Sequence, residues 1–222
     1  MTTPLLLCWS GGKDSARSLR ELRKDPGVRV VGLLTTLTTE FDRVSMHGIR
    51  RELVVAQAKA AGLELGFAEI PNPCSNEAYE AAMERALAPW IAKGVRHVAF
   101  GDIFLEDLKR YREEKLARAG LTGVFPIFGR STRELAREHV ELGFRAVVTC
   151  LDPRVLPKSF AGRELDASFF AELPPAVDPC GENGEYHTFV HAGPIFREPI
   201  PFVVGATVER DGFVFTDVTA PR

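Results

Sequence analysis

The chain has 222 residues, of which 45% are hydrophobic and 26% are charged, and its formal net charge at pH 7 is −2. This length and composition allow a packed core in one large domain, or in a domain with a smaller partner. The slightly negative net charge argues against broad, nonspecific nucleic-acid binding. No apolar run reaches the roughly 18–20 residues that span a bilayer.

Two further features indicate the cellular compartment. Residues 1–4 lack the basic segment that opens a signal peptide. The cysteines are scattered and form no CxxC pair; they are Cys8, Cys74, Cys150 and Cys180. We therefore expect a reduced, cytoplasmic protein without a zinc site and without membrane association.

The first predicted elements are a short strand, a polar loop and a helix. Leu5 to Leu7 form an apolar run typical of a buried strand, and residues 16–22 carry apolar side chains at helical spacing. Glycines let the loop backbone approach a ligand closely, and the free N–H groups and dipole of a helix start attract anions. Serine hydroxyls and a lysine add hydrogen-bond donors and a positive charge. The sequence therefore predicts a phosphate site in the loop Ser10-Gly11-Gly12-Lys13-Asp14-Ser15.

This loop does not have the spacing of the commoner phosphate loop, in which four residues separate a Gly from Gly-Lys-Ser/Thr. The alternative is an ordinary glycine-rich turn with a serine cap. That alternative explains the two glycines but not the whole run.

Strands and helices alternate through the next part of the chain. Val28 to Leu34 is a second apolar run, suited to a parallel strand buried on both faces. The polar stretch from Thr35 to His47 follows at its carboxyl end, where open α/β sheets bind ligands. Next we predict a helix over 50–61, a strand over 63–70, and a helix over 76–93 that Asn76 caps and that Pro89 shortens or kinks.

The alternation continues to about residue 150. A strand over 96–100 leads into Gly101 and Asp102, and a charged helix covers 105–119. A short extended piece at 124–128, a helix over 131–142 with Ser131 and Glu134 in capping-box spacing, and a strand over 145–150 follow. This pattern predicts an α/β fold with a doubly wound parallel sheet and helices on both faces.

The last part of the chain has a different pattern. Residues 152–201 are rich in proline and show no long helical period, and residues 202–207 and 213–218 are predicted to form a β-hairpin across Asp211-Gly212. We therefore predict an α/β nucleotide-binding domain over residues 1–125. Residues 126–222 form a smaller, loop-rich α+β domain for the substrate in this prediction.

Several acids and polar residues follow the predicted strands. Asp14 suits a bridging Mg²⁺, although it could instead cap the helix start. Gly101 permits close approach of the backbone to a ligand. Asp102 could hold Mg²⁺ or orient a substrate amine, or it could only cap the end of the strand. Thr35 and His47 belong to a loop that is either solvated or next to a ligand. Arg110, Arg112 and Lys158 could meet anionic groups, or be surface cations.

A second dense group of polar residues is Asp178-Pro179-Cys180-Gly181-Glu182-Asn183-Gly184-Glu185-Tyr186-His187-Thr188. The two glutamates could bind an ammonium, a cationic substrate or a metal, and His187 could shuttle a proton. The alternative is a polar turn before Phe189-Val190. Cys180 is better explained as a small buried residue than as a nucleophile.

The loop at residues 10–15 resembles the PP-loop of the ATP pyrophosphatases, which cleave ATP between its α and β phosphates. Over nearly its whole length, the chain resembles the diphthine–ammonia ligase family of those enzymes. The similarity rests on three stretches, which are residues 10–15, Gly101-Asp102-Ile103 with its Arg-rich helix, and residues 180–190 with 193–196. Characterised members use ATP to activate the carboxylate of diphthine on translation elongation factor 2, and ammonia then gives the amide.

This resemblance, together with the residues themselves, implies a candidate site with ATP and Mg²⁺. The catalytic candidates are Lys13, Asp14, Asp102 and Glu185, with Asp14 as the Mg²⁺ ligand. The nucleotide-binding candidates are Ser10, Gly11, Gly12, Lys13, Asp14, Ser15, Thr35, Met46, His47 and Gly101. The substrate-binding candidates are Asp102, Glu182, Asn183, Glu185 and His187.

The resemblance departs from the archaeal and eukaryotic pattern at two positions. Asn183 replaces a glycine and His187 replaces a glutamate, a form that is more similar to bacterial relatives. Because bacteria do not make diphthamide, diphthine itself is not the expected substrate.

We expect an enzyme that adenylates a small or protein-borne carboxylate, releases AMP and pyrophosphate, and transfers the acyl group to ammonia or an amine. The alternatives are a tRNA-modifying PP-loop enzyme, against which the acidic balance argues, and a regulator that binds ATP or AMP without turnover. A homodimer is an open possibility.

Overall fold

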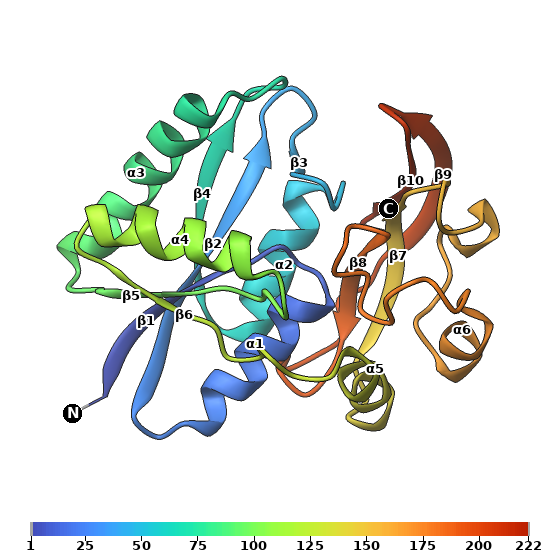
Figure 1. Cartoon of the computed structure of the whole chain (residues 1–222), viewed down its shortest axis with the longest axis horizontal. Coiled ribbons are helices and arrows are strands. Elements are labelled where there is room, and N and C mark those ends of the chain that lie inside the picture. Colours follow the sequence, from blue (N-terminus) through green and yellow to red (C-terminus); the bar gives the residue numbers. More distant parts are fainter. Residues whose placement is uncertain (1, 222) are drawn as a thin grey trace.

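The computed structural model describes residues 2–221 and contains two sheets (Figure 1). The strands of the first sheet are hydrogen-bonded in the order β4-β2-β1-β5-β6, and all of these pairs are parallel. A two-residue strand, β3, pairs antiparallel with the end of β2, beyond the part that pairs with β1. The strand bounds are β1 Thr3–Cys8, β2 Val28–Thr38, β3 Arg43–Val44, β4 Glu64–Ile70, β5 His97–Ala99 and β6 Thr122–Val124.

Helices cover both faces of this sheet, as expected for a doubly wound fold. They are α1 Lys13–Lys24, α2 Arg51–Ala61, α3 Asn76–Ala92 and α4 Glu106–Arg118. In β1, Leu5 and Leu7 pack in the cluster that contains α1 and α2, whereas Leu6 packs in the cluster that contains α3 and α4. This alternation explains the unbroken apolar run in the sequence, because each face of the strand is buried under a different helix pair. The predicted fold class is confirmed.

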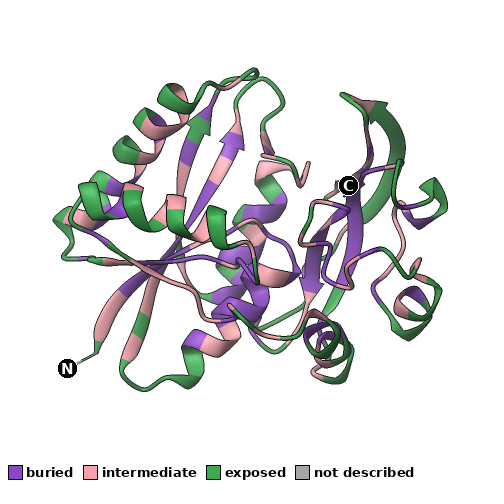
Figure 2. Cartoon of the chain, viewed as in Figure 1, coloured by how far each residue is buried: buried purple, intermediate pink, exposed green. Residues whose placement is uncertain are grey.

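The second sheet is antiparallel, with strand order β8-β7-β10-β9. Its elements are α5 Thr132–Glu141, β7 Arg145–Leu151, a 3₁₀ turn at Lys158–Phe160, α6 Ala167–Glu172, β8 Tyr186–Ala192, β9 Val203–Arg210 and β10 Phe213–Thr219. β9 and β10 form the predicted terminal hairpin, and both residues of its turn, Asp211 and Gly212, have positive φ. Figure 2 shows β7 and β8 largely buried and the edge strand β9 largely exposed.

The prediction that the strand at 145–150 belongs to the parallel sheet is wrong. This strand is β7, and its partners β8 and β10 come later in the chain. A strand that is buried on both faces gives the same apolar run in either kind of sheet, so the sequence pattern could not separate the two cases. The strands of the second sheet all follow residue 126, the predicted start of the C-terminal domain. One apolar cluster nevertheless includes Leu19 of α1 and Phe189 of β8, so the two sheets share a core.

Smaller differences concern element ends. The second strand continues to Thr38 instead of stopping at Leu34, since its threonines pair with β4 and favour extended backbone. Ser75, not Asn76, caps α3, because the Ser75 hydroxyl accepts a hydrogen bond from the Ala78 N–H. α3 continues past Pro89 to Ala92. The extended piece expected at 124–128 is limited to β6, which ends at Val124.

An ion-pair cluster joins the two parts of the chain. Arg50 Nη2 lies 2.7 Å from Asp217 Oδ2, and Arg43 Nη1 lies 2.8 Å from Asp217 Oδ1. Arg43 also donates a hydrogen bond to the Gly48 carbonyl. Partial burial acts to raise the pKa of Asp217, but the hydrogen bonds from both arginines outweigh it and set this pKa to about 2. The cluster therefore ties the segment after β2 to strand β10.

We expect Asp217→Asn to lower the free energy of unfolding by about 1 kcal/mol at pH 7, after allowing for solvent screening. Because the folded-state pKa lies below the ordinary aspartate value, the stabilisation is complete above about pH 4 and is lost as pH falls towards 2. Urea unfolding of both proteins at several pH values measures this. A difference that stays constant down to pH 2 would contradict the ion-pair explanation.

No helix within residues 2–221 is both long enough and apolar enough to cross a membrane.

Candidate active site

The predicted phosphate loop lies between β1 and α1, at the carboxyl edge of the first sheet. Gly11 has φ +77°, a conformation that glycine adopts without strain. The Ser15 hydroxyl donates to the Gly12 carbonyl at 2.9 Å, and the Ser10 oxygen lies 3.3 Å from the Ser15 hydroxyl. The N-cap residue of α1 is Gly12, which has no side chain, and the Thr188 hydroxyl accepts only the Lys13 N–H. The dipole of α1 and the N–H groups that follow Lys13 in its first turn therefore still favour an anion.

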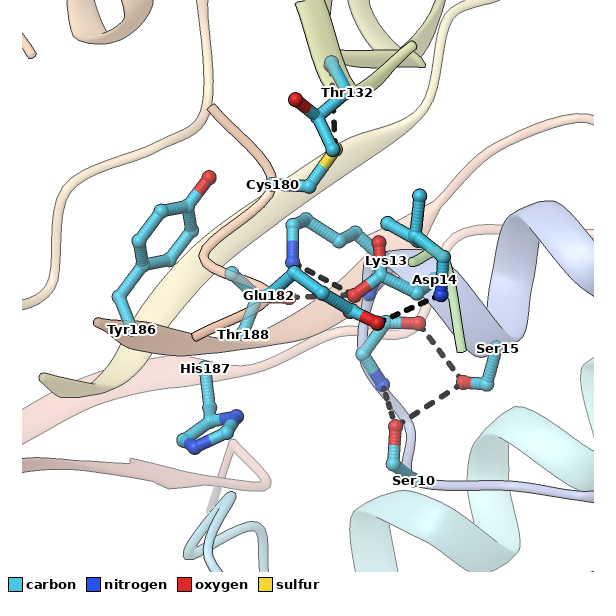
Figure 3. A network of polar contacts seen from close by, with 12 residues as sticks. Ser10, Lys13, Asp14, Ser15, Thr132, Cys180, Glu182, Tyr186, His187 and Thr188 are labelled. Carbon is cyan, nitrogen blue, oxygen red and sulfur yellow. Dashed lines mark hydrogen bonds and ion pairs between the residues drawn. The ribbon is translucent and has the colours of Figure 1, made fainter. Parts of the chain in front are cut away.

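Lys13 and Asp14 form a buried ion pair at this helix start (Figure 3). Lys13 Nζ lies 2.8 Å from Asp14 Oδ2 and 5.0 Å from the centre of the Tyr186 ring. Burial alone would lower the pKa of Lys13, but the negative charge of Asp14 outweighs it and the pKa is raised. Burial raises the pKa of Asp14. The lysine is thus charged, and its ammonium lies where phosphate oxygens would approach.

A cavity of about 400 Å³ begins at this loop and is lined by several parts of the chain. These parts are the phosphate loop, the end of β2 with β3 and the following turn, the β5–α4 connection, helices α3 and α4, and the segment before β8 with the start of β8. The predicted site residues that line it are Ser10, Lys13, Asp14, Ser15, Met46, His47, Gly101, Asp102, Glu182 and His187. Residues far apart in the sequence are therefore brought to one hollow, as a shared site requires.

Strand β8 binds directly to the phosphate loop. The Val190 N–H donates to the Gly11 carbonyl at 2.9 Å, and the Lys13 N–H donates to the Thr188 hydroxyl at 3.1 Å. His47 Nδ1 lies 3.0 Å from the Thr188 carbonyl. The second sheet is thus a wall of the cavity.

Gln57 of α2 fixes this arrangement and was missed by sequence reasoning. Its amide nitrogen donates to the carbonyls of Gly11 and Val190 at 2.9 and 2.6 Å, and its oxygen accepts from Trp9 Nε1 at 2.9 Å. The residue is fully buried. One side chain therefore joins β8, the phosphate loop and the end of β1.

Gln57→Leu would leave the Val190 carbonyl and the Trp9 indole N–H without this partner, whereas the Gly11 carbonyl keeps its hydrogen bond from the Val190 N–H. We expect the free energy of unfolding to fall by about 2–4 kcal/mol. Each buried group that loses its hydrogen bond costs roughly 1–3 kcal/mol, and the surrounding structure recovers part of this cost by relaxing. Affinity for ATP should fall as well. Chemical denaturation and nucleotide titration measure the two effects. The matched control is Lys59→Leu, at an exposed position of the same helix, which should change stability by no more than about 0.5 kcal/mol and leave ATP affinity unaltered.

Gly101 and Asp102 lie on the other side of the phosphate loop. A Cβ at Gly101 would be 3.1 Å from the Asp14 carbonyl carbon and the Ser15 nitrogen, so glycine permits the close approach of the two loops. Asp102 pairs with Arg112 of α4, whose Nε and Nη2 lie 2.7 and 3.2 Å from the two carboxylate oxygens. Arg112, which the sequence left as a possible surface cation, is therefore part of the site.

The two glutamates of the segment before β8 have different surroundings and different roles. Glu182 lines the cavity, and its Oε1 accepts the Ile103 N–H at 2.7 Å. Burial raises the pKa of Glu182 to about 7. Glu185 is buried and accepts hydrogen bonds from the backbone N–H groups of Asp178 and Asn183. Glu185, predicted to be catalytic, therefore holds the loop in shape, and Asn183 is exposed beside it.

Two histidines face the cavity from different segments. The rings of His47 and His187 have centres 4.7 Å apart. Burial lowers the pKa of His47 to about 4 and that of His187 well below its ordinary value. Both rings are thus neutral at pH 7, which disfavours the predicted proton shuttle at His187. Its Nε2 is buried without a hydrogen-bond partner among the described residues, so it can bond to a ligand.

Other predicted residues lie outside the cavity lining. The side chain of Thr35 is buried and its hydroxyl donates to the Trp9 carbonyl at 2.7 Å, whereas its neighbour Thr36 lines the cavity. Gly11 and Gly12 are buried beneath the loop surface. Cys180 is buried, and burial raises the pKa of its thiol, in agreement with a packing role.

The carboxylate oxygens at the cavity fit a Mg²⁺ ion that is bound together with phosphates. Within residues 2–221, no three acidic, histidine or cysteine side chains are grouped closely enough to hold a metal by themselves. Mg²⁺ commonly uses one or two carboxylates and completes its shell with phosphate oxygens and water. Desolvation raises the pKa values of the partly buried Asp14 and Glu182 carboxyl groups, which a cation would stabilise in the charged form.

Comparison with protein families concerns the second part of the chain. Residues 131–213 match the family described as the diphthamide synthase C-terminal domain. The comparison with curated proteins gives no match. The resemblance seen in the sequence is thus confirmed for this segment, and it indicates a ligase-type enzyme. The matched segment includes β8 and the loop before it that carries Glu182, here called the Glu182 loop, and both line the cavity.

Proposed function

We propose that the protein is an ATP-dependent ligase that joins a carboxylate to ammonia or an amine through an acyl-adenylate. One observation carries this proposal. A diphthamide synthase domain is hydrogen-bonded through Thr188 and Val190 to a Ser-Gly-Gly-Lys-Asp-Ser loop at a helix start. A candidate phosphate site and the domain of a known amide-forming family thus share one cavity.

The first step is attack of a substrate carboxylate oxygen on the α-phosphorus of ATP. The bond to the β-phosphate oxygen breaks, and pyrophosphate leaves with its negative charge. The N-terminus of α1 and the Lys13 ammonium bind that charge as it develops. Bound Mg²⁺, held by Asp14 with phosphate oxygens, would supply further charge neutralisation.

The second step is attack of ammonia or an amine on the activated carbonyl carbon. The C–N bond forms, AMP leaves, and the nitrogen loses a proton. Glu182, with a pKa of about 7, is suited to take that proton near neutral pH. Asp102, oriented by Arg112, can bind the nitrogen nucleophile before attack. The Glu182 loop lines the cavity and would help to keep water from the adenylate.

Product analysis with α-labelled ATP tests this function. The protein is incubated with Mg²⁺ and ammonium, with and without a pool of carboxylic metabolites, and AMP and ADP are separated. We expect AMP that depends on the pool and is lost in Asp14→Asn. Formation of ADP and phosphate without AMP would contradict the proposal. Tight ATP binding without any AMP would favour a nucleotide-binding regulator instead.

A further inference from the structure

A second cavity, of about 280 Å³, lies between α3 and α4, next to the first. Four residues line both cavities, namely Tyr79, Met83, Phe100 and Arg112. The two cavities therefore adjoin, and Arg112 is one of the residues between them. We call the second cavity the α3–α4 groove.

The floor of the α3–α4 groove is apolar. Leu87 and Ile91 of α3, Leu116 of α4 and Phe100 at the end of β5 line it together with Met83. These residues belong to the core cluster on this face of the first sheet. A surface of this kind favours a hydrocarbon or ring over water.

Polar contacts across the groove set its width. Glu80 of α3 forms an ion pair with Lys115 of α4, and the Tyr111 hydroxyl lies 3.4 Å from Glu80 Oε1. The two helices are thus linked above an apolar floor. The groove is therefore a formed feature of the fold.

Arg112 places a positive charge at the end of the groove that adjoins the first cavity. Its guanidinium lies 4.3 Å from the centre of the Phe100 ring and pairs with Asp102 at the catalytic end. A molecule with an apolar body in the groove would place a terminal anionic group at this cation, facing the phosphate loop. Thr36 and Ser45 give the first cavity a polar lining away from the groove. This lining suits the edge of a nucleotide base better than the apolar groove does.

We propose that the α3–α4 groove binds the apolar body of the carboxylate substrate, so that the enzyme selects carboxylates with a hydrocarbon or aromatic part of several carbons. This inference rests on the proposed function for the identity of the reacting group. It places the carboxylate at Arg112 and the nonreacting part between the helices.

Binding of straight-chain carboxylates tests the inference without turnover. Calorimetry measures butanoate, hexanoate and octanoate in the presence of Mg²⁺ and α,β-methylene-ATP, which cannot release pyrophosphate. We expect the dissociation constant to fall about fourfold for each added methylene that is buried, at roughly 0.8 kcal/mol per group. Ala119→Trp should fill the far end of the groove and abolish this dependence, because Ala119 lines it.

Ala117→Trp is the matched control, since Ala117 is exposed in the last turn of α4 and is not part of the groove lining. Ala119→Phe provides a smaller obstruction if the tryptophan variant unfolds. Dissociation constants that do not depend on chain length in the unaltered protein would overturn the inference, as would equal losses at positions 117 and 119. Loss of nucleotide affinity in Ala119→Trp would assign the groove to the adenine and also overturn it. Chain-length-dependent binding in a protein that never forms AMP would contradict the proposed reaction but leave the groove's ligand class in place.

Discussion

Lys13→Met should lower kcat/KM for ATP by about 10²–10³-fold, the usual loss when a charge-stabilising group is removed from an active site. Methionine is also unbranched, so the shape of the buried side chain is nearly conserved. The change removes the only group within the phosphate loop that carries positive charge. Initial rates of AMP formation over a range of ATP concentrations measure the effect.

Two further variants separate charge loss from unfolding. Removing one partner of a buried ion pair is destabilising, so Lys13→Met should unfold at a lower temperature because Asp14 is left without its partner. Lys13→Met with Asp14→Asn removes both charges and should recover stability but not activity. Lys24→Met, at an exposed position of the same helix, should retain the full rate. A folded Lys13→Met protein within threefold of the unaltered rate would contradict the role of Lys13.

Gly12→Ala should lower kcat/KM for ATP by about 10²-fold, because misplacement by about 1 Å can cost that much. A Cβ at Gly12 would lie 2.4 Å from His47 Cε1 and 3.1 Å from the Thr188 carbonyl oxygen. The His47 ring must therefore move, which breaks its hydrogen bond to Thr188 and disturbs the cavity wall. Overpacking of this kind also costs about 1–3 kcal/mol of stability.

Gly205→Ala is the control for this substitution, because the added Cβ would make only ordinary contacts, the nearest at 3.4 Å from Asp217 Cβ. Nucleotide titration and thermal unfolding of both variants are compared. A second variant, Gly12→Ala with His47→Ala, makes room for the new methyl group and should recover part of the stability. If Gly12→Ala binds ATP as tightly as the unaltered protein, the close contact between the phosphate loop and His47 is not needed for binding.

The features that the sequence predicted well depend on local patterns. Leu5 to Leu7 indicated a strand buried on both faces, and the following glycines and serines indicated a strand–loop–helix junction. Asp211 and Gly212 indicated the terminal hairpin. In each case a few neighbouring residues determine the backbone, so no knowledge of distant contacts was needed.

The features that the sequence missed depend on distant contacts. Gln57 lies in an ordinary helical pattern, yet its partners are 46 and 133 residues away. Glu182 and Glu185 are the same residue type, so the sequence does not distinguish them. Only the fold of their loop places Glu182 at the cavity and Glu185 against backbone N–H groups. Arg112 likewise looks like one of many helix cations until α4 brings it to Asp102.

Exchange of labelled pyrophosphate into ATP is the most direct test of the central claim, that the substrate carboxylate attacks the α-phosphorus. The assay contains Mg²⁺, ATP, labelled pyrophosphate and a carboxylate found active in the product analysis, with ammonia left out. We predict label in ATP that requires the carboxylate and disappears in Asp14→Asn, because adenylation is then reversible and cannot proceed to the amide. Exchange of labelled ADP into ATP, without exchange of pyrophosphate, would mean that the γ-phosphoryl group is transferred, and would contradict the account.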